Sequence, residues 1–237
     1  MRFLIISDIH ANWDALDAVL NEAEGHYDIV LNCGDLVGYG PEPNRVVDWC
    51  RATNAAVVRG NHDKAAIGMA DLEWFNPVAK RAAIWTGEML TEENRLYLAQ
   101  LPQGPISVQD FELFHGSPMD EDEYLVETAD VEHIVPNTTL SFFGHTHLQG
   151  GFFIHRNGIR PLGGPSFLVE ETAAYLVNPG SVGQPRDRDP RAGYVLYDSD
   201  TRTVVYHRVS YDVIRAAQKI FETDLPEVLG LRLFRGA

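Results

Sequence analysis

Several short apolar runs in this sequence end in small clusters of aspartate, asparagine and histidine. Each run has the length and composition of a buried strand, as at residues 3–7 and 139–143. In an α/β sheet the loops beyond the carboxyl ends of the strands converge on one crevice, so we expect these polar side chains to meet. Residues two apart, such as Asp8 and His10, would point the same way along an extended backbone. The clusters are Asp8-Ile9-His10, Gly34-Asp35, Gly60-Asn61-His62-Asp63, His115-Gly116 and Gly144-His145-Thr146-His147.

Strands and helices alternate in the first sixty residues. Strands are predicted at 3–7, 28–32 and 55–59, with a helix capped by Asn12 and another over 44–52 between them. This βαβαβ order is typical of a largely parallel sheet.

A second group of strands follows a more helical middle segment, in which Pro77 begins a helix that runs to about residue 90. Hairpin turns are predicted at 109–110 and 157–158. We therefore predict an α/β fold of two packed mixed sheets flanked by helices, a four-layer α-β-β-α sandwich. Residues 1–237 form a single domain in this prediction, with a loosely attached tail from about residue 225. The later strands are expected at 106–108, 112–115, 139–143, 151–156, 159–162, 174–178, 194–198 and 203–208, and a last helix at 211–221.

The balance of charge limits the expected partners. The sequence has 19 Lys and Arg against 34 Asp and Glu, a formal charge of −15. Such a surface repels nucleic acid and anionic membranes, so we expect neither a duplex nor a membrane as a partner. The acidic run 120–123 is expected to be a solvated loop. Cys33 and Cys50 form no CxxC pair and no run reaches ~18 apolar residues, so a reducing cytoplasm is the expected location.

The donor atoms in the clusters indicate metal binding. Carboxylate and amide oxygens and imidazole nitrogens suit a pair of divalent Mn, Fe, Zn or Ni ions, and we favour manganese. Two adjacent cations with a bridging water form a hydrolytic centre for phosphate esters. His26, His133, His155 and His207 match no cluster and are expected to be ordinary surface or core residues.

The motifs as a set resemble the calcineurin-like metallophosphoesterase superfamily. They are Asp8-x-His10, Gly34-Asp35-x-x-Gly38, Gly60-Asn61-His62-Asp63, His115 and Gly144-His145-x-His147. Residues 7–12 and 178–186 resemble in particular the small bacterial and archaeal phosphodiesterase-type members. The resemblance implies that Asp8, His10 and His147 hold one ion, that Asn61, His115 and His145 hold the other, and that Asp35 bridges both.

The resemblance also implies how the reaction proceeds. A water or hydroxide shared by the two ions attacks phosphorus, because their joint charge lowers its pKa. His62 contacts the phosphate and protonates the leaving oxygen. From its position next to His62, Asp63 could orient and charge the imidazole. An alternative is that His62 only forms hydrogen bonds behind the metal ligands. Arg59 and Arg186 are expected to bind substrate phosphate, although Arg59 could equally be a strand-end surface residue.

The expected enzyme is a metal-dependent phosphoric ester hydrolase that acts on a small phosphodiester or phosphomonoester, such as a nucleotide or an aryl phosphodiester. One alternative is a metal-binding but catalytically idle scaffold for protein partners, and another is a protein phosphatase. Trp13, Tyr39 and Trp74 could line a base or aryl pocket, but ordinary packing is the favoured interpretation. The motifs describe the reaction centre and leave the substrate open.

Overall fold

Strands from both ends of the chain form the first sheet of the computed structural model, which describes residues 1–53 and 55–237. The strands are β1 (Arg2–Ile6), β2 (Ile29–Asn32), β3 (Ala56–Val57), β9 (Ser166–Leu168), β11 (Ala192–Asp198) and β12 (Thr203–Val209). Within the described residues they pair in the order β3-β2-β1-β11-β12-β9. β1, β2 and β3 pair in parallel, as the early alternation predicts, whereas β11 pairs antiparallel with β1. The sheet is therefore mixed.

The second sheet comes from the middle of the chain. Its strands are β4 (Ile106–Val108), β5 (Phe111–Leu113), β6 (Leu140–Phe142), β7 (Gly150–His155), β8 (Gly158–Pro161) and β10 (Ala174–Asn178). In the described residues they pair in the order β4-β5-β6-β10-β7-β8. β5, β6 and β10 pair in parallel and the other pairs are antiparallel. Both predicted hairpins are confirmed, since they join β4 to β5 and β7 to β8.

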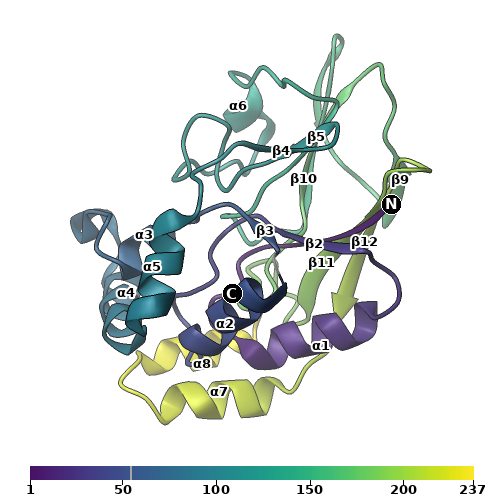
Figure 1. Cartoon of the computed structure of the whole chain (residues 1–237). Coiled ribbons are helices and arrows are strands. Elements are labelled where there is room, and N and C mark those ends of the chain that lie inside the picture. The colour runs from purple at the N-terminus through teal and green to yellow at the C-terminus, as the bar shows by residue number, and fades with distance from the viewer. Residues whose placement is uncertain (54) are drawn as a thin grey trace.

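Helices cover the outer faces of the two sheets. They are α1 (Trp13–Ala23), α2 (Pro43–Thr53), α3 (Asn61–Ala66), α4 (Pro77–Met89), α5 (Glu92–Gln100), α6 (Thr128–Val131), α7 (Val213–Phe221) and α8 (Glu227–Leu233), with a 3-10 helix η1 (Leu72–Trp74). Asn12 caps α1, as predicted, because its side chain accepts a hydrogen bond from the Ala15 backbone N–H at 3.2 Å. Figure 1 shows α1, α2, α7 and α8 together on one side of the molecule and α6 on the opposite side.

The alternation of side chains along β1 explains the layers. Leu4 and Ile6 belong to the apolar core beneath α1 and α2, whereas Phe3 and Ile5 belong to the core between the two sheets. The outer face of the second sheet packs against Val131 of α6. The predicted four-layer sandwich is confirmed, and none of the helices in the described residues has the length and apolar character to cross a bilayer.

The end of the chain differs from the expected loose tail. Residues 227–233 form α8, which lies beside α7. Leu229 and Leu233 are four residues apart and so share one face of α8, and Leu225 lies just before the helix. All three leucines are buried. They pack with Ala216 and Ile220 of α7 in a further apolar cluster. The expectation of a loose tail is therefore wrong, because this apolar face belongs to the core.

Candidate metal centre

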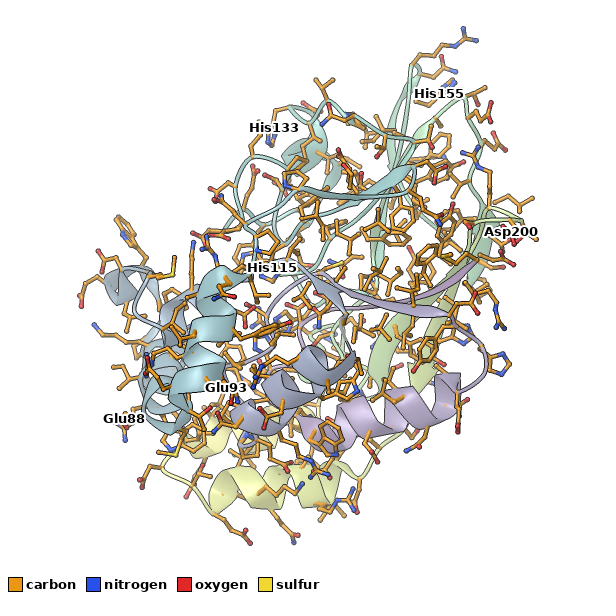
Figure 2. The ribbon with its side chains drawn as sticks, in the orientation of Figure 1. Glu88, Glu93, His115, His133, His155 and Asp200 are labelled. Carbon is orange, nitrogen blue, oxygen red and sulfur yellow. The ribbon has the colours of Figure 1, made fainter. Side chains whose placement is uncertain are left out.

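The side chains predicted to bind metal come together just beyond the strand ends. Asp8, His10, Asp35 and His147 offer ligand atoms that all lie within 4.8 Å of one another. Asp35, His115 and His145 form a second group of the same kind. These residues are buried, and Figure 2 shows His115 in the interior of the molecule, while His133 and His155 lie at its outer edge. The predicted convergence of the loops is confirmed.

The backbone reaches this arrangement through left-handed conformations. Asp8, His10 and Asp35 have φ of 52°, 49° and 56°, and His145 and His147 have φ of 66° and 61°. Non-glycine residues avoid this region, at a cost of order 1–3 kcal/mol each. The expected extended backbone at Asp8 and His10 is therefore wrong. Such strain persists where the surrounding structure holds it, and it is concentrated at functional sites.

Two motif glycines let neighbouring segments approach the centre closely. Gly38 has a φ of +88°, and a Cβ at this position would lie 2.7 Å from Nδ1 of His62. A Cβ at Gly60 would collide with Oδ1 of Asp35. Glycine is required at both positions because any larger residue would displace a side chain of the centre.

The first group brings two imidazole lone pairs face to face. Nδ1 of His10 donates to the Val37 carbonyl at 3.0 Å, and Nδ1 of His147 donates to the Gln184 carbonyl at 2.5 Å. Burial lowers the pKa of both histidines well below its usual value, so the rings are neutral. Their Nε2 atoms, 3.0 Å apart, therefore both carry lone pairs. Two lone pairs at this separation repel each other unless a cation lies between them.

The second group gathers two further imidazoles around an amide oxygen. Oδ1 of Asn61 lies 3.2 Å from Nε2 of His115 and 3.0 Å from Nδ1 of His145. Nδ1 of His115 donates to the Cys33 carbonyl at 2.7 Å, and Nε2 of His145 donates to the Asp122 carbonyl at 3.1 Å. These backbone carbonyls orient the rings so that Nε2 of His115 and Nδ1 of His145 face inward. Metal-bound histidines are usually held in this way, by a hydrogen bond from the ring nitrogen that does not bind the metal.

The two carboxylates give the centre a negative character. Oδ2 of Asp8 and Oδ2 of Asp35 are buried and have no hydrogen-bond partner among the described residues. Burial raises the pKa of Asp8 to about 7. Burial opposes a charge on His115, but the Asp35 and Asp8 carboxylates raise the pKa of this histidine to about 10. Unpartnered carboxylate oxygens beside inward-facing imidazoles fit two divalent cations that share Asp35.

Asp63 has a different role from the one expected. Its Oδ2 accepts hydrogen bonds from the backbone N–H groups of Asp35 and Gly60, each at 3.0 Å, and its Oδ1 accepts one from Val37 at 3.1 Å. Among the described residues it forms no hydrogen bond with His62. The prediction that Asp63 orients and charges this imidazole is therefore wrong, because both of its oxygens bind the loop that carries Asp35.

Replacing Asp63 by alanine is expected to destabilise the metal-free protein by about 3 kcal/mol, because three buried N–H groups would lose their hydrogen-bond acceptor. Urea unfolding of the metal-free variant measures this change, with the exposed Asp200→Ala as the control. An unchanged free energy of unfolding would contradict the role of Asp63 in holding the loop that carries Asp35. Asp63 would then act only in the reaction.

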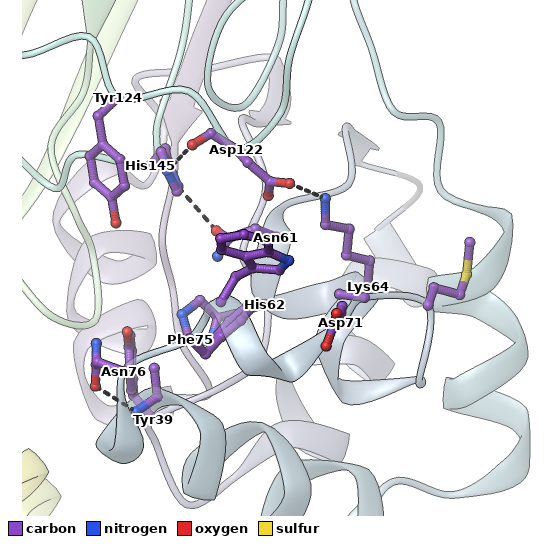
Figure 3. Close-up of a pocket in the computed structure, with 14 residues that line it drawn as sticks. Tyr39, Asn61, His62, Lys64, Asp71, Phe75, Asn76, Asp122, Tyr124 and His145 are labelled. Carbon is purple, nitrogen blue, oxygen red and sulfur yellow. Dashed lines mark hydrogen bonds and ion pairs between the residues drawn. The ribbon is translucent and has the colours of Figure 1, made fainter.

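His62 lies on the wall of a pocket beside the centre (Figure 3). Its ring centroid lies 4.3 Å from that of Tyr39 and 5.4 Å from that of Phe75. Its Nδ1 is buried and has no hydrogen-bond partner among the described residues. Burial lowers the pKa of His62 to about 4, which is opposite to the shift that a charging Asp63 would cause.

The two arginines predicted to bind substrate lie in different surroundings. The guanidinium of Arg59 donates to both carboxylate oxygens of Glu121, at 2.8 and 3.2 Å, and Arg59 is not part of the pocket wall. Its role in binding phosphate stays a prediction without geometric support. Arg186 lies closer, because its backbone N–H donates to the His147 carbonyl at 3.3 Å and its Nη2 donates to the Tyr39 hydroxyl at 3.4 Å.

The acidic run 120–123 contributes to the centre in a way that the sequence analysis missed. Glu121 is only 5% exposed and lies 3.0 Å from Nζ of Lys64 as well as beside Arg59, so the expected solvated loop is wrong at this residue. The next residue, Asp122, supplies the carbonyl that orients His145. The sequence offered one indication of this contact, because the basic residues Arg59 and Lys64 on either side of the 60–63 motif need acidic partners.

Comparison with known proteins agrees with this geometry. Residues 1–202 match the model of the calcineurin-like phosphoesterase superfamily domain. An uncharacterised protein of Methanocaldococcus jannaschii is 36% identical over 244 residues, which cover 98% of this chain and 97% of that protein. A metallophosphoesterase from Sphaerobacter thermophilus has a TM-score of 0.85 and 39% identity, over 100% of this chain and 99% of that one. A hypothetical protein from Pyrococcus horikoshii shares the fold, with a TM-score of 0.80, 23% identity and coverage of 100% and 98%. The chain therefore belongs to the calcineurin-like phosphoesterase superfamily and is a phosphoric ester hydrolase.

Proposed function

We propose that this protein hydrolyses a small phosphodiester, or a phosphomonoester, at a centre of two divalent cations. The observation that carries the proposal is the pair of donor groups that share Asp35 and face a pocket. When bound, the two cations would supply an activated water and neutralise the charge on the phosphoryl oxygens. The oxygen and nitrogen donors suit Mn, Fe, Zn or Ni, of which manganese is our choice.

The proposed ligands follow the two groups. Asp8, His10 and His147 would hold one cation and Asn61, His115 and His145 the other, with Asp35 in contact with both. The inward-facing lone pairs of His10, His145 and His147 support this assignment. So do the Oδ2 atoms of Asp8 and Asp35, which accept no hydrogen bond within the described residues. The carbonyls of Val37, Gln184, Cys33 and Asp122 fix the rings, so that little reorganisation accompanies binding.

His62 is the residue that we propose acts on the substrate directly. It lines the pocket next to Asn61 and His145, which puts it beside the second donor group. Tyr39 and Phe75 hold its ring in place by packing against it. The negative phosphate of a bound substrate would raise the pKa of His62 and favour the imidazolium form. An N–H of that ring would donate to an ester oxygen and deliver the proton as the oxygen leaves.

The size and surroundings of the pocket indicate a small substrate. The pocket has a volume of about 510 Å³, within the range of sites that bind small molecules. The charge of −15 disfavours nucleic acid duplexes and anionic lipid surfaces as substrates. Cys33 and Cys50 are both buried free thiols, which supports the cytoplasm as the proposed location.

The proposal is tested by turnover of bis(p-nitrophenyl) phosphate with and without Mn²⁺. Turnover is expected to depend on added metal, to disappear with EDTA and to return when Mn²⁺ is restored in excess. Metal analysis of the active protein should give two ions per chain. If no divalent metal supports turnover, the protein is a metal-binding scaffold. If phosphopeptides are hydrolysed much faster than small esters, it is a protein phosphatase.

A further inference from the structure

The mouth of the pocket beside the metal centre is surrounded by exposed apolar side chains. Trp74 is 88% exposed, Met69 is 53% exposed and Tyr124 is 51% exposed, and all three line this pocket. Ordinary packing, the favoured interpretation for Trp74, is therefore wrong for this residue. Apolar groups gathered at the rim of a concave site indicate binding, because a ligand would remove them from water.

The wall that carries Trp74 is held in place by local capping. The side chain of Asp71 accepts a hydrogen bond from the Glu73 backbone N–H at 2.9 Å and so caps η1. Asn76 accepts hydrogen bonds from the backbone N–H groups of Val78 and Ala79 and begins α4. The caps at Asp71 and Asn76 thus hold the short segment between α3 and α4. Trp74, the last residue of η1, therefore lies on an ordered part of the pocket wall.

Aromatic rings connect both sides of the pocket with the donor groups. On one side, the ring of Phe75 meets His62 edge to face, with centroids 5.4 Å apart. On the other side, the ring of Tyr124 lies against His145, with centroids 3.9 Å apart. Figure 3 shows Phe75 near His62 and Tyr124 near His145. A flat group that enters between these walls would therefore reach the proposed reaction centre.

The charged residues of the pocket disfavour an anionic occupant. Among the described lining residues the basic side chain is Lys64, and its Nζ already lies 2.5 Å from Asp122 and 3.0 Å from Glu121. Asp71 and Asp122 line the pocket and are exposed. Further phosphates of a polyphosphate chain would find carboxylates there and no unpaired cation.

We infer that this pocket selects phosphate esters whose leaving group is a flat, uncharged aromatic ring, and that Trp74 is the specificity-determining residue. The inference rests on the proposed function, because His62 on the pocket wall would protonate the leaving oxygen. The ring lies between the segment that carries Trp74 and Phe75 and the loop that carries Tyr124. Stacking on Trp74 supplies most of the preference, since an indole offers a large face to any planar group.

Competition by phosphonates, which cannot be hydrolysed, tests this inference on the Mn²⁺-loaded protein. Phenylphosphonate and methylphosphonate share the anionic head and differ in the ring. We expect phenylphosphonate to inhibit turnover of the chromogenic diester with an inhibition constant about tenfold below that of methylphosphonate. Trp74→Ala should remove this difference, and Leu168→Ala, which changes an exposed apolar residue of β9, should keep it. Adding a carboxylate to the ring, in 4-carboxyphenylphosphonate, should weaken inhibition at least severalfold.

A direct binding signal separates this inference from the proposed function. Phenylphosphonate should quench tryptophan fluorescence in the Mn²⁺-loaded protein, and the quenching should be lost in Trp74→Ala. If the diester is hydrolysed while both phosphonates inhibit equally, the selectivity is overturned and the hydrolase stands. Absence of both turnover and phosphonate binding would overturn the proposed function itself.

Discussion

Replacing Asp35 by asparagine is expected to lower turnover of a phosphodiester by more than about 10³-fold and to reduce the bound metal below two ions per chain. Asp35 is the one residue that belongs to both donor groups. At an effective dielectric constant of about 20, two unit charges 4 Å apart attract each other by about 4 kcal/mol, which corresponds to roughly 10³-fold in affinity. An amide removes this attraction for both cations at once.

The local backbone should tolerate this substitution. Oδ1 of Asp35 accepts a hydrogen bond from the His62 backbone N–H at 2.8 Å, and an asparagine oxygen can accept the same bond. Metal content by elemental analysis and turnover over a range of Mn²⁺ concentrations measure the effect, with Asp17→Asn on α1 as the control. A variant that keeps two ions and loses little activity would show that Asp35 does not bridge, and the division of ligands would have to be redrawn.

The meeting of the polar clusters in one site could be predicted from the sequence, because strand ends determine where loops meet. The apolar runs before Asp8, Asp35 and Gly144 predicted neighbouring strand ends, and the structure has them as β1, β2 and β6. The sequence did not show how the backbone turns beyond those ends. Left-handed φ values at Asp8 and Asp35 arise from contacts with distant loops, such as the hydrogen bond from Asp8 N to the Gly34 carbonyl.

The sequence did not reveal which residues form hydrogen bonds with the proposed metal ligands and their loops. Asp63 follows His62 directly, so adjacency suggested a pair, but neighbouring residues of a helix point in different directions. Asp63 turns toward the Asp35 loop and His62 toward the pocket. The carbonyl of Asp122 orients His145 through its backbone, which no side-chain motif can reveal. Tertiary contacts decide these roles.

The expected loose tail was missed for a similar reason. Leu229 and Leu233 belong to a short helix whose isolated stability is marginal, so local sequence gave little reason to expect order. Packing against α7 supplies that stability. The prediction for Trp74 was wrong in the other direction. This residue was expected to pack in the interior but is exposed beside the site.

Substitution of His62 by glutamine is expected to lower kcat by about 10²–10⁴-fold for diesters with a poor leaving group, and by far less for p-nitrophenyl esters. Glutamine can still donate a hydrogen bond but cannot deliver a proton. A p-nitrophenolate leaves without protonation, so its departure depends little on an acid. Two metal ions should remain bound, since His62 belongs to neither donor group.

A series of aryl phosphodiesters with leaving groups of rising pKa distinguishes proton transfer from positioning. The loss caused by His62→Gln should grow along the series if the histidine protonates the leaving oxygen. A loss of the same size for every ester would mean that His62 only positions the phosphate. His155→Gln is the matched control, because this histidine lies at the outer edge of the molecule and should leave the series unchanged (Figure 2). Full metal content in both variants is needed to attribute the difference to the imidazole.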